Sequence, residues 1–193
     1  MNNLKELLDQ SASRHAHLCP RQVLGVRMGM LAGELLKLDL PQVNKRLFAF
    51  VESDGCGMGG IEIATGCRAD RRTLRIVDYG KMAASFVDTQ TGECLRIRPH
   101  PDSRISAGKY APKAIDAWHC QLDAYQIIPF EELFEVQPIR LSISLEKIIS
   151  EPGLRAFCVA CGEEITNERE VVEGGRILCR SCAGDRYYIS LIT

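Results

Sequence analysis

The chain has 193 residues, of which 46% are hydrophobic and 25% are charged, and its formal net charge at neutral pH is −1. These values are typical of a globular protein with one sizeable core and room for a small appendage. A charge so close to zero argues against non-specific binding to nucleic acids or anionic membranes. No apolar run approaches the roughly 20 residues of a membrane span, and the first residues lack a signal-peptide pattern. The sequence therefore predicts a cytoplasmic protein with no membrane or nucleic-acid partner.

The hydrophobic pattern predicts helices and strands in irregular order. Helices are expected over residues 2–13, 20–38, 61–65, 112–127 and 183–188, and strands over residues 46–52, 73–78, 83–89, 94–98 and 135–144. Such an order indicates an α+β fold, in which an antiparallel β-meander packs with helices. Glu151-Pro152-Gly153 predicts a linker between a core domain of residues 1–150 and a small C-terminal domain of residues 151–193.

The second predicted helix carries glycines at every fourth position, Gly25, Gly29 and Gly33. Each glycine costs about 1 kcal/mol relative to alanine inside a helix, so a compensating interaction is expected. That interaction is a very close approach of another backbone, either from within the chain or from a second copy of it.

Three metal-binding side chains alternate just before this helix, in the run His15-Ala16-His17-Leu18-Cys19-Pro20. Imidazole and thiolate together suit zinc, iron or copper better than magnesium or calcium. Pro20 favours the first helical turn, which places Cys19 at the helix N-terminus, where the helix dipole stabilises a thiolate. The alternative is a small buried cysteine beside two surface histidines.

A second thiol group is expected to meet the first. Cys56 lies in a glycine-rich turn before a short helix, and Cys67 follows that helix. His17 and Cys19 could therefore converge with Cys56 and Cys67 into a site with a vacant coordination position. The alternative is that Cys56 and Cys67 are buried thiols that fill gaps in the core.

Basic residues near these thiols also have two interpretations. Arg68, Arg71, Arg72 and Arg75 form either a solvated strand edge or a surface that grips an anionic cofactor or substrate. Lys81, in the run Asp78-Tyr79-Gly80-Lys81, either belongs to a simple turn or contacts a substrate.

The most specific pattern lies in the tail, where Cys158 and Cys161 form one C-x-x-C pair and Cys179 and Cys182 form another. Their spacing predicts a tetrahedral zinc site, and four thiolates leave no open position, so this zinc is structural. Gly162 is expected to take a positive φ, and the Gly174-Gly175 pair is expected to turn a hairpin between the two C-x-x-C pairs. Disulfides or idle thiols are the alternative.

Taken in order, these motifs resemble the FmdE family, which is named after a subunit of formylmethanofuran dehydrogenase, over roughly residues 10–145. The matching pieces are His-x-His-x-Cys-Pro, Gly25-Val-Arg-Met-Gly29, Cys56 in its glycine-rich turn, Thr65-Gly-Cys67 and Asp78-Tyr-Gly-Lys81. The resemblance implies an α+β core that is commonly dimeric, with His17, Cys19 and Cys56 as catalytic or metal-binding residues. It also implies Cys67 and Lys81 as cofactor-binding residues. The tail is similar to the treble-clef or zinc-ribbon appendage of some members.

The resemblance implies a metal-binding protein with structural zinc in the tail and zinc or another transition metal in the core. It would act as an enzyme or accessory subunit in one-carbon, formylmethanofuran-type or molybdenum-enzyme metabolism. Its expected partners are a second copy of the chain and the subunits of molybdenum or tungsten dehydrogenases. One position departs from the family, which often has Cys-x-x-Asp where this chain has Cys56-Gly-Met-Gly59. The alternative function is a zinc-stabilised interaction scaffold without catalysis.

Overall fold

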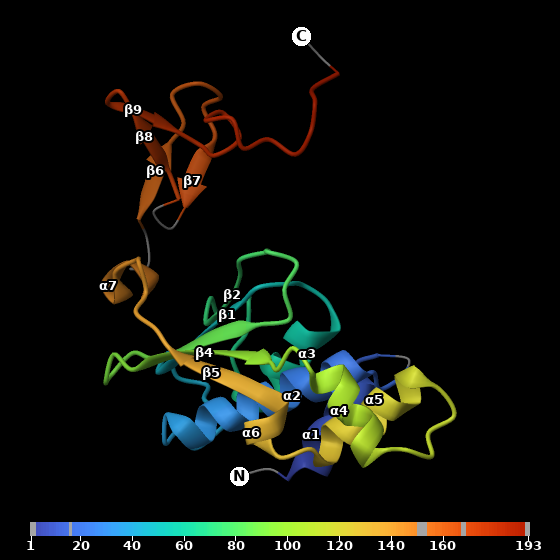
Figure 1. The fold of residues 1–193 in the computed structure, drawn as a ribbon. Coiled ribbons are helices and arrows are strands. Elements are labelled where there is room, and N and C mark those ends of the chain that lie inside the picture. The colour runs from blue at the N-terminus through green and yellow to red at the C-terminus, as the bar shows by residue number, and fades with distance from the viewer. Residues whose placement is uncertain (1–2, 16, 150–153, 167–168, 192–193) are drawn as a thin grey trace. The chain divides into compact units, whose positions relative to one another are not determined.

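The computed structural model describes residues 3–15, 17–149, 154–166 and 169–191. Its internal contacts divide the chain into two compact units, residues 1–140 and residues 141–193, and each is described by itself (Figure 1). Within the described residues, no helix is long and apolar enough to cross a membrane. The predicted linker at residues 151–153 lies outside the described residues.

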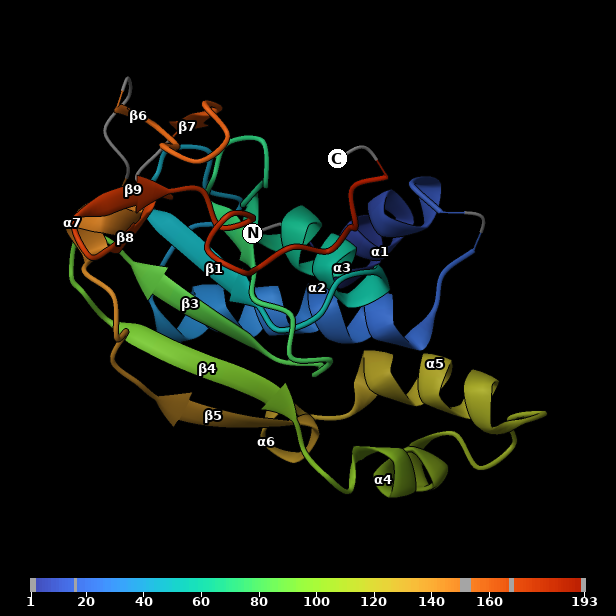
Figure 2. The same cartoon turned by 90° about the horizontal axis from the view of Figure 1, so that it is seen from above.

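The larger unit combines helices with one sheet, so the predicted α+β fold is confirmed (Figures 1 and 2). Its helices are α1 (Leu4–Ser13), α2 (Pro20–Leu35), α3 (Cys56–Thr65), α4 (Ser103–Tyr110), α5 (Ala117–Ile127) and α6 (Phe130–Leu133). Its strands are β1 (Leu47–Val51), β2 (Leu74–Ile76), β3 (Ala84–Asp88), β4 (Cys94–Pro99) and β5 (Phe134–Pro138).

The described strands of this unit lie in the order β2-β1-β3-β4-β5. Strands β1, β3, β4 and β5 pair antiparallel, as the predicted meander requires, but β2 runs parallel to β1. The reason is the connection, because a helix between two neighbouring strands returns the chain to the same end of the sheet. Helix α3 provides that crossover. Two further predictions are wrong in extent: α4 was missed, and the helix predicted over residues 112–127 begins only at Ala117.

Helices α2 and α3 touch through glycines. A Cβ atom built on Gly25 would lie 2.1 Å from the carbonyl oxygen of Gly57, and one on Gly29 would lie 2.6 Å from the Cβ of Ala64. Distances this short leave no room for a side chain. The close approach predicted from the glycine spacing is therefore a contact within the chain. Because residue numbers rise together along both helices, α2 and α3 run in the same direction and begin side by side.

A buried arginine fixes α5 and α6 against α2. The Arg27 guanidinium donates a hydrogen bond to the backbone carbonyl of Tyr125 at 2.7 Å and lies 4.6 Å from the centre of the Phe130 ring. Burial lowers the pKa of Arg27 to about 10, so it remains charged at neutral pH. A hydrogen bond and a cation–π contact partly offset the cost of burying that charge.

The smaller unit contains two hairpins. Strands β6 (Arg155–Phe157) and β7 (Glu164–Thr166) form one, strands β8 (Val171–Glu173) and β9 (Arg176–Leu178) form the other, and the short helix α7 (Leu145–Ile148) precedes them. Gly174 and Gly175 turn the second hairpin with φ values of 55° and 77°, and Gly162 has a φ of 76°. Both glycine predictions are confirmed.

The helix predicted over residues 183–188 is wrong, because the chain makes turns there. The N–H of Cys182 points to the sulfur of Cys179 at 3.4 Å, and the N–H of Asp185 bonds to the carbonyl of Arg180. Gly184, with a φ of 102°, then leaves the helical region of backbone conformation. Turns around the thiols thus replace helical hydrogen bonds.

We predict that Gly25→Ala destabilises the larger unit by about 3 kcal/mol, because the new methyl group would overlap the backbone of α3. Gly108 provides a matched control, since it lies in a helix with open space around it. There, Gly108→Ala should raise the free energy of unfolding by about 1 kcal/mol. Urea unfolding followed by the fluorescence of Trp118 reports on this unit, because the sequence has no other tryptophan. Equal stability of the two variants would contradict the proposed helix contact.

Candidate functional site

The thiols of Cys19 and Cys56 interact where α2 and α3 begin. Cys19 is the residue before the first turn of α2, and its N–H donates to the side-chain oxygen of Gln22 at 2.7 Å. Cys56 is the first residue of α3, and both cysteines are half-buried. Burial, followed by the nearby Cys19 thiol, raises the pKa of Cys56, although Arg21 acts in the opposite direction. The expected stabilisation of this thiolate by the helix N-terminus is therefore outweighed.

The segment leading to Cys19 runs along one face of α3. Arg14 forms an ion pair with Glu62 at 3.5 Å, and the Nε2 atom of His15 lies 3.5 Å from the position of a Cβ on Gly59. Residues 56, 59 and 62 share one helix face, because they are three apart. The structure thus brings the His15 imidazole toward the face that carries Cys56. Gly59 leaves space in front of that imidazole.

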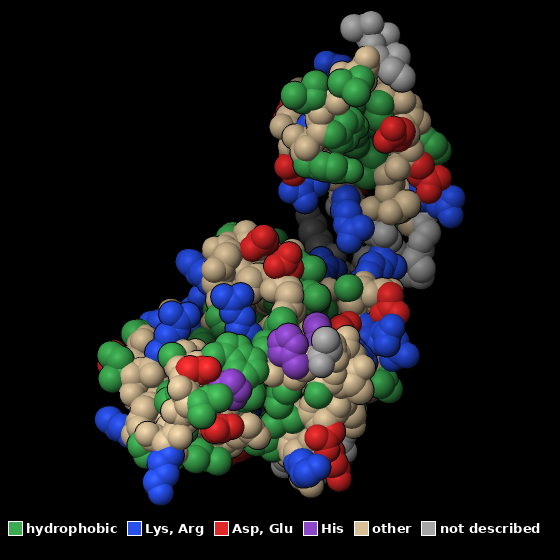
Figure 3. Space-filling view, turned by 90° about the vertical axis from the view of Figure 1, so that its right-hand side faces the viewer, with side chains coloured by type: hydrophobic (Ala, Val, Ile, Leu, Met, Phe, Trp, Pro, Cys, Tyr) green, Lys and Arg blue, Asp and Glu red, His purple; other side chains and the backbone are tan. Residues whose placement is uncertain are grey.

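His17 points elsewhere. Its ring centre lies 6.1 Å from that of Trp118, whose own ring meets His119 edge-on at 4.8 Å. His119 is held by Asp116, with its Nδ1 atom 3.0 Å from a carboxylate oxygen, which agrees with the expectation of a satisfied helix histidine. Figure 3 shows histidines gathered beside hydrophobic side chains on one face of the larger unit. Within the described core, no three His, Cys, Asp or Glu ligand atoms gather as closely as those of the tail.

Cys67 lies in the hydrophobic core, with none of its surface exposed. Its sulfur donates to the backbone carbonyl of Leu47 at 3.4 Å, and burial raises its pKa to about 11. The ten residues of α3 separate it from Cys56 by roughly 15 Å. Its predicted role in cofactor binding stays a prediction, and this position does not favour it.

A cavity of about 620 Å³ opens next to the thiol pair. Helices α2, α3 and α4 begin at its wall, through Pro20, Gly57 and Ser103 respectively. Its charged lining consists of Arg21, Asp54, Asp78, Lys81, Arg96, Arg98 and Arg104. Lys81 therefore lies where the sequence predicted a cofactor-binding or substrate-binding group, although its role stays a prediction.

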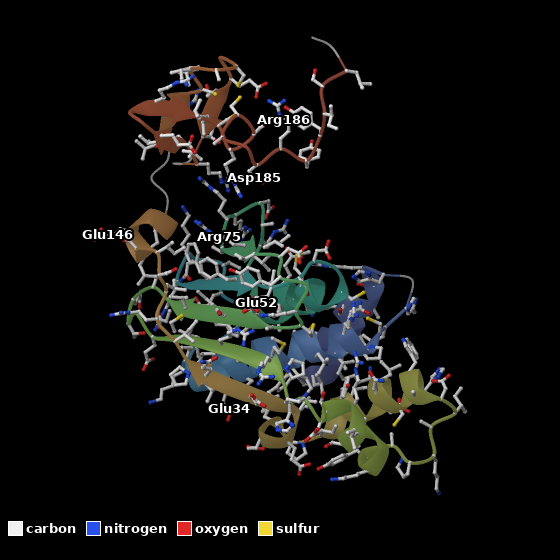
Figure 4. The ribbon with its side chains drawn as sticks, turned by 45° about the horizontal axis from the view of Figure 1, so that its top comes forward. Glu34, Glu52, Arg75, Glu146, Asp185 and Arg186 are labelled. Atoms are coloured by element: carbon white, nitrogen blue, oxygen red, sulfur yellow. The ribbon has the colours of Figure 1, made fainter. Side chains whose placement is uncertain are left out.

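Glu52, at the end of β1, holds one side of this cavity (Figure 4). Its carboxylate accepts two hydrogen bonds from Arg96, at 2.6 and 2.7 Å. Its backbone carbonyl accepts the N–H groups of Tyr79 and Lys81, at 2.9 and 3.0 Å. One buried residue thus fixes both an arginine on β4 and the loop that carries Lys81.

Sequence reasoning missed the arginines of this cavity, because they are scattered along the chain between residues 21 and 104. One local signal was present: Arg96 and Arg98 alternate on β4, so they share a face of the sheet. The basic cluster that the sequence did suggest behaves differently. Arg68 is exposed and forms a double hydrogen bond with Asp70, at 2.7 and 2.8 Å, as expected for a solvated strand edge.

In the tail, the sulfur atoms of Cys158, Cys161, Cys179 and Cys182 all lie within 4.8 Å of one another. The Cys161 and Cys179 sulfurs are 3.9 Å apart, close to the edge of roughly 3.8 Å expected for a tetrahedron with zinc–sulfur distances of about 2.3 Å. Backbone N–H groups, first that of Cys179, lower the pKa of Cys158 to about 6.

The neighbouring thiols, first Cys179, raise the pKa of Cys182 to about 12. Four thiolates therefore repel one another at this position unless a cation joins them. The donor set and its spacing fit zinc, as the sequence predicted.

Comparisons with known proteins agree with these sites. Residues 14–135 match the family described as "FmdE, Molybdenum formylmethanofuran dehydrogenase operon". Residues 153–188 match the family described as "Prokaryotic dksA/traR C4-type zinc finger". The second match covers all four tail cysteines, so the tail is a four-cysteine zinc finger.

A relative from Archaeoglobus fulgidus, described as "Probable S-adenosyl-L-methionine-binding protein", is 27% identical over 214 residues. The alignment covers 97% of this chain but only 55% of that protein, so the chain spans about half the length of its relative. A crystal structure of an FmdE-like protein of tungsten formylmethanofuran dehydrogenase from Syntrophus aciditrophicus has a similar fold. It superimposes with a TM-score of 0.58 at 21% identity, covering 97% of this chain and 96% of that one. The family match spans more than half of the chain, and the chain belongs to the FmdE family.

Proposed function

We propose that the core of this FmdE-family protein binds a second metal ion through Cys19 and Cys56, beside a cavity that admits a small ligand. The observation that supports this most directly is the pairing of the two thiols at the adjoining starts of α2 and α3. Thiolates select zinc or another soft transition metal over magnesium and calcium. When bound, such an ion polarises a carbonyl group or activates water if one coordination position stays open.

The third donor in this proposal is His15. Its Nε2 atom faces the side of α3 that carries Cys56, whereas His17 lies against Trp118. The sequence favoured His17 because it stands two residues from Cys19. The direction of the segment along α3 favours His15 instead.

We propose that the chain acts in one-carbon or molybdenum-enzyme metabolism, and that its donor set suits an accessory, metal-holding protein better than an enzyme. Two thiols and one exposed imidazole form an incomplete set, so the ion would exchange readily. Gly59 supplies neither a ligand nor a proton-transfer group where the family often has an aspartate. Asp54 lines the cavity and is the nearest substitute in the sequence if the chain does catalyse a reaction.

A zinc-stabilised interaction scaffold without catalysis is the second candidate. It is favoured by one observation: within the described residues, only the tail gathers a complete set of metal ligands. The metal content of the purified protein separates the two candidates, since a scaffold holds the tail zinc alone.

We predict that removing zinc from the full chain unfolds the tail and leaves the larger unit folded. The buried hydrophobic residues of the tail form a cluster of only Cys158, Ile165 and Leu178 among the described residues, too little to hold a fold without metal. After treatment with a strong chelator, proteolysis should cut within residues 154–191 while Trp118 fluorescence stays native. A tail that resists protease after elemental analysis shows no zinc would contradict this prediction.

We predict two metal ions per chain in the wild type and one in the double variant Cys19→Ser/Cys56→Ser, measured by elemental analysis. Cys94→Ser is the matched control, because Cys94 is a half-buried thiol on β4 and should keep both ions. His15→Ala should lower the occupancy of the core site, and His17→Ala should leave it unchanged. One zinc ion in every variant would rule out the core site and favour the scaffold.

We predict that Gly59→Asp strengthens metal retention in the core about tenfold, because it places a carboxylate beside His15, as a ligand or as its hydrogen-bond partner. Competition with a chromogenic chelator measures the retention. The same substitution at Gly108, an exposed helix position with open surroundings, tests for a general effect of added negative charge. Equal retention in wild type and Gly59→Asp would show that position 59 does not face the metal.

A further inference from the structure

We propose that the cavity at the starts of α2, α3 and α4 binds a small organic anion with at least two acidic groups, of the phosphate or polycarboxylate class. This inference names the ligand of the core site and to that extent rests on the proposed function. The charge of the cavity itself supports it, whether or not a metal is bound nearby.

The first support is the state of the cationic side chains. Arg96 is engaged by Glu52, and Arg98 forms an ion pair with Glu135 at 2.5 Å. The other basic residues of the lining are Arg21, Lys81 and Arg104. Within the described residues, none of these three forms an ion pair with a carboxylate. Three positive groups without a carboxylate partner therefore face one space.

The second support comes from the helix starts. Their first-turn N–H groups are not bonded within the helix, and the helix dipole places partial positive charge there. The residue before α3 is Gly55, which has no side chain, and the side chain of Asp102 does not cap α4. These N–H groups remain available to an anion at the same cavity wall as the arginines.

The carboxylates on the lining do not cancel this charge. Asp78 is engaged in its own turn, where it accepts the N–H of Gly80 at 2.9 Å. Asp54 forms no ion pair with Arg21 or Lys81 in the described structure. A ligand with two acidic groups can reach Arg21 on α2 and Arg104 on α4 at once. Those two residues come from different sides of the wall, and arginine forks bind such groups with two hydrogen bonds.

Neutral polar groups complete the lining. Tyr125 is 2% exposed, and its hydroxyl lies 3.4 Å from the side-chain oxygen of Gln121. Both residues lie on α5 and line the cavity, as does Ser103. Such groups recognise hydroxyl or carbonyl oxygens, so they suit the organic part of a metabolite.

Isothermal titration of the full chain with pyrophosphate and with succinate, at constant ionic strength, tests this inference. Both probes should bind the wild type, and Arg21→Gln and Arg104→Gln should each weaken binding about tenfold by removing charge-assisted hydrogen bonds. Lys109→Gln is the matched control, because Lys109 lies on α4 but not on the cavity lining. No binding of either probe to the wild type, or an equal loss in Lys109→Gln, would overturn the proposal.

Two comparisons separate this inference from the proposed function. The Cys19→Ser/Cys56→Ser variant should still bind both probes, because the basic groups and helix starts remain. Loss of binding in that variant would show that a core metal, rather than the cavity, holds the anion. S-Adenosyl-L-methionine, with two positive groups and one carboxylate, should bind at least tenfold more weakly than pyrophosphate, roughly the effect of losing one charge-assisted contact. Tighter binding of that compound would refute the assigned ligand class.

Discussion

The contact between α2 and α3 is the constraint on which the core site depends. Side chains at Gly25 or Gly29 would overlap the facing helix, so the glycines allow the two backbones to touch. The close contact fixes both the distance between the helices and their relative register. Because the helices run in the same direction, the register also sets their first residues side by side. Cys19 and Cys56 are therefore neighbours although 36 residues separate them in the sequence.

This arrangement has an electrostatic consequence. Two helices that begin together bring two partial positive charges together, which is unfavourable unless something negative lies there. Within the described residues the fold supplies little negative charge at that point, and it adds α4 and several arginines to the same wall. Glu52 neutralises Arg96 alone. The remaining positive charge is balanced by solvent ions or by a ligand, and this is why the cavity and the thiol pair are best considered together.

The sequence predicted these features to different degrees, for physical reasons. The tail ligands are close in sequence, so their spacing alone was enough to predict the zinc site. The glycine spacing predicted a close backbone contact, but periodicity cannot say which element provides it. Cys19 was correctly placed at a helix start because proline marks such starts. Which histidine faces α3 depends on the path of a loop, and the cavity arginines come together only through the tertiary fold; neither is encoded locally.

The two thiol sites of the chain contrast in completeness, and the contrast bears on function. In the tail, four sulfurs surround one point, so a bound zinc has no position left for exchange or chemistry. In the core, two thiols and one imidazole approach α3, and Gly59 leaves the next place on that helix face without a side chain. An ion there would keep open positions, and it would lie next to a cavity whose charge selects anions. A closed site stabilises a fold, whereas an open site beside a ligand cavity can exchange its metal or act on a bound molecule. The larger unit therefore carries the function, and the zinc finger stabilises its own small fold.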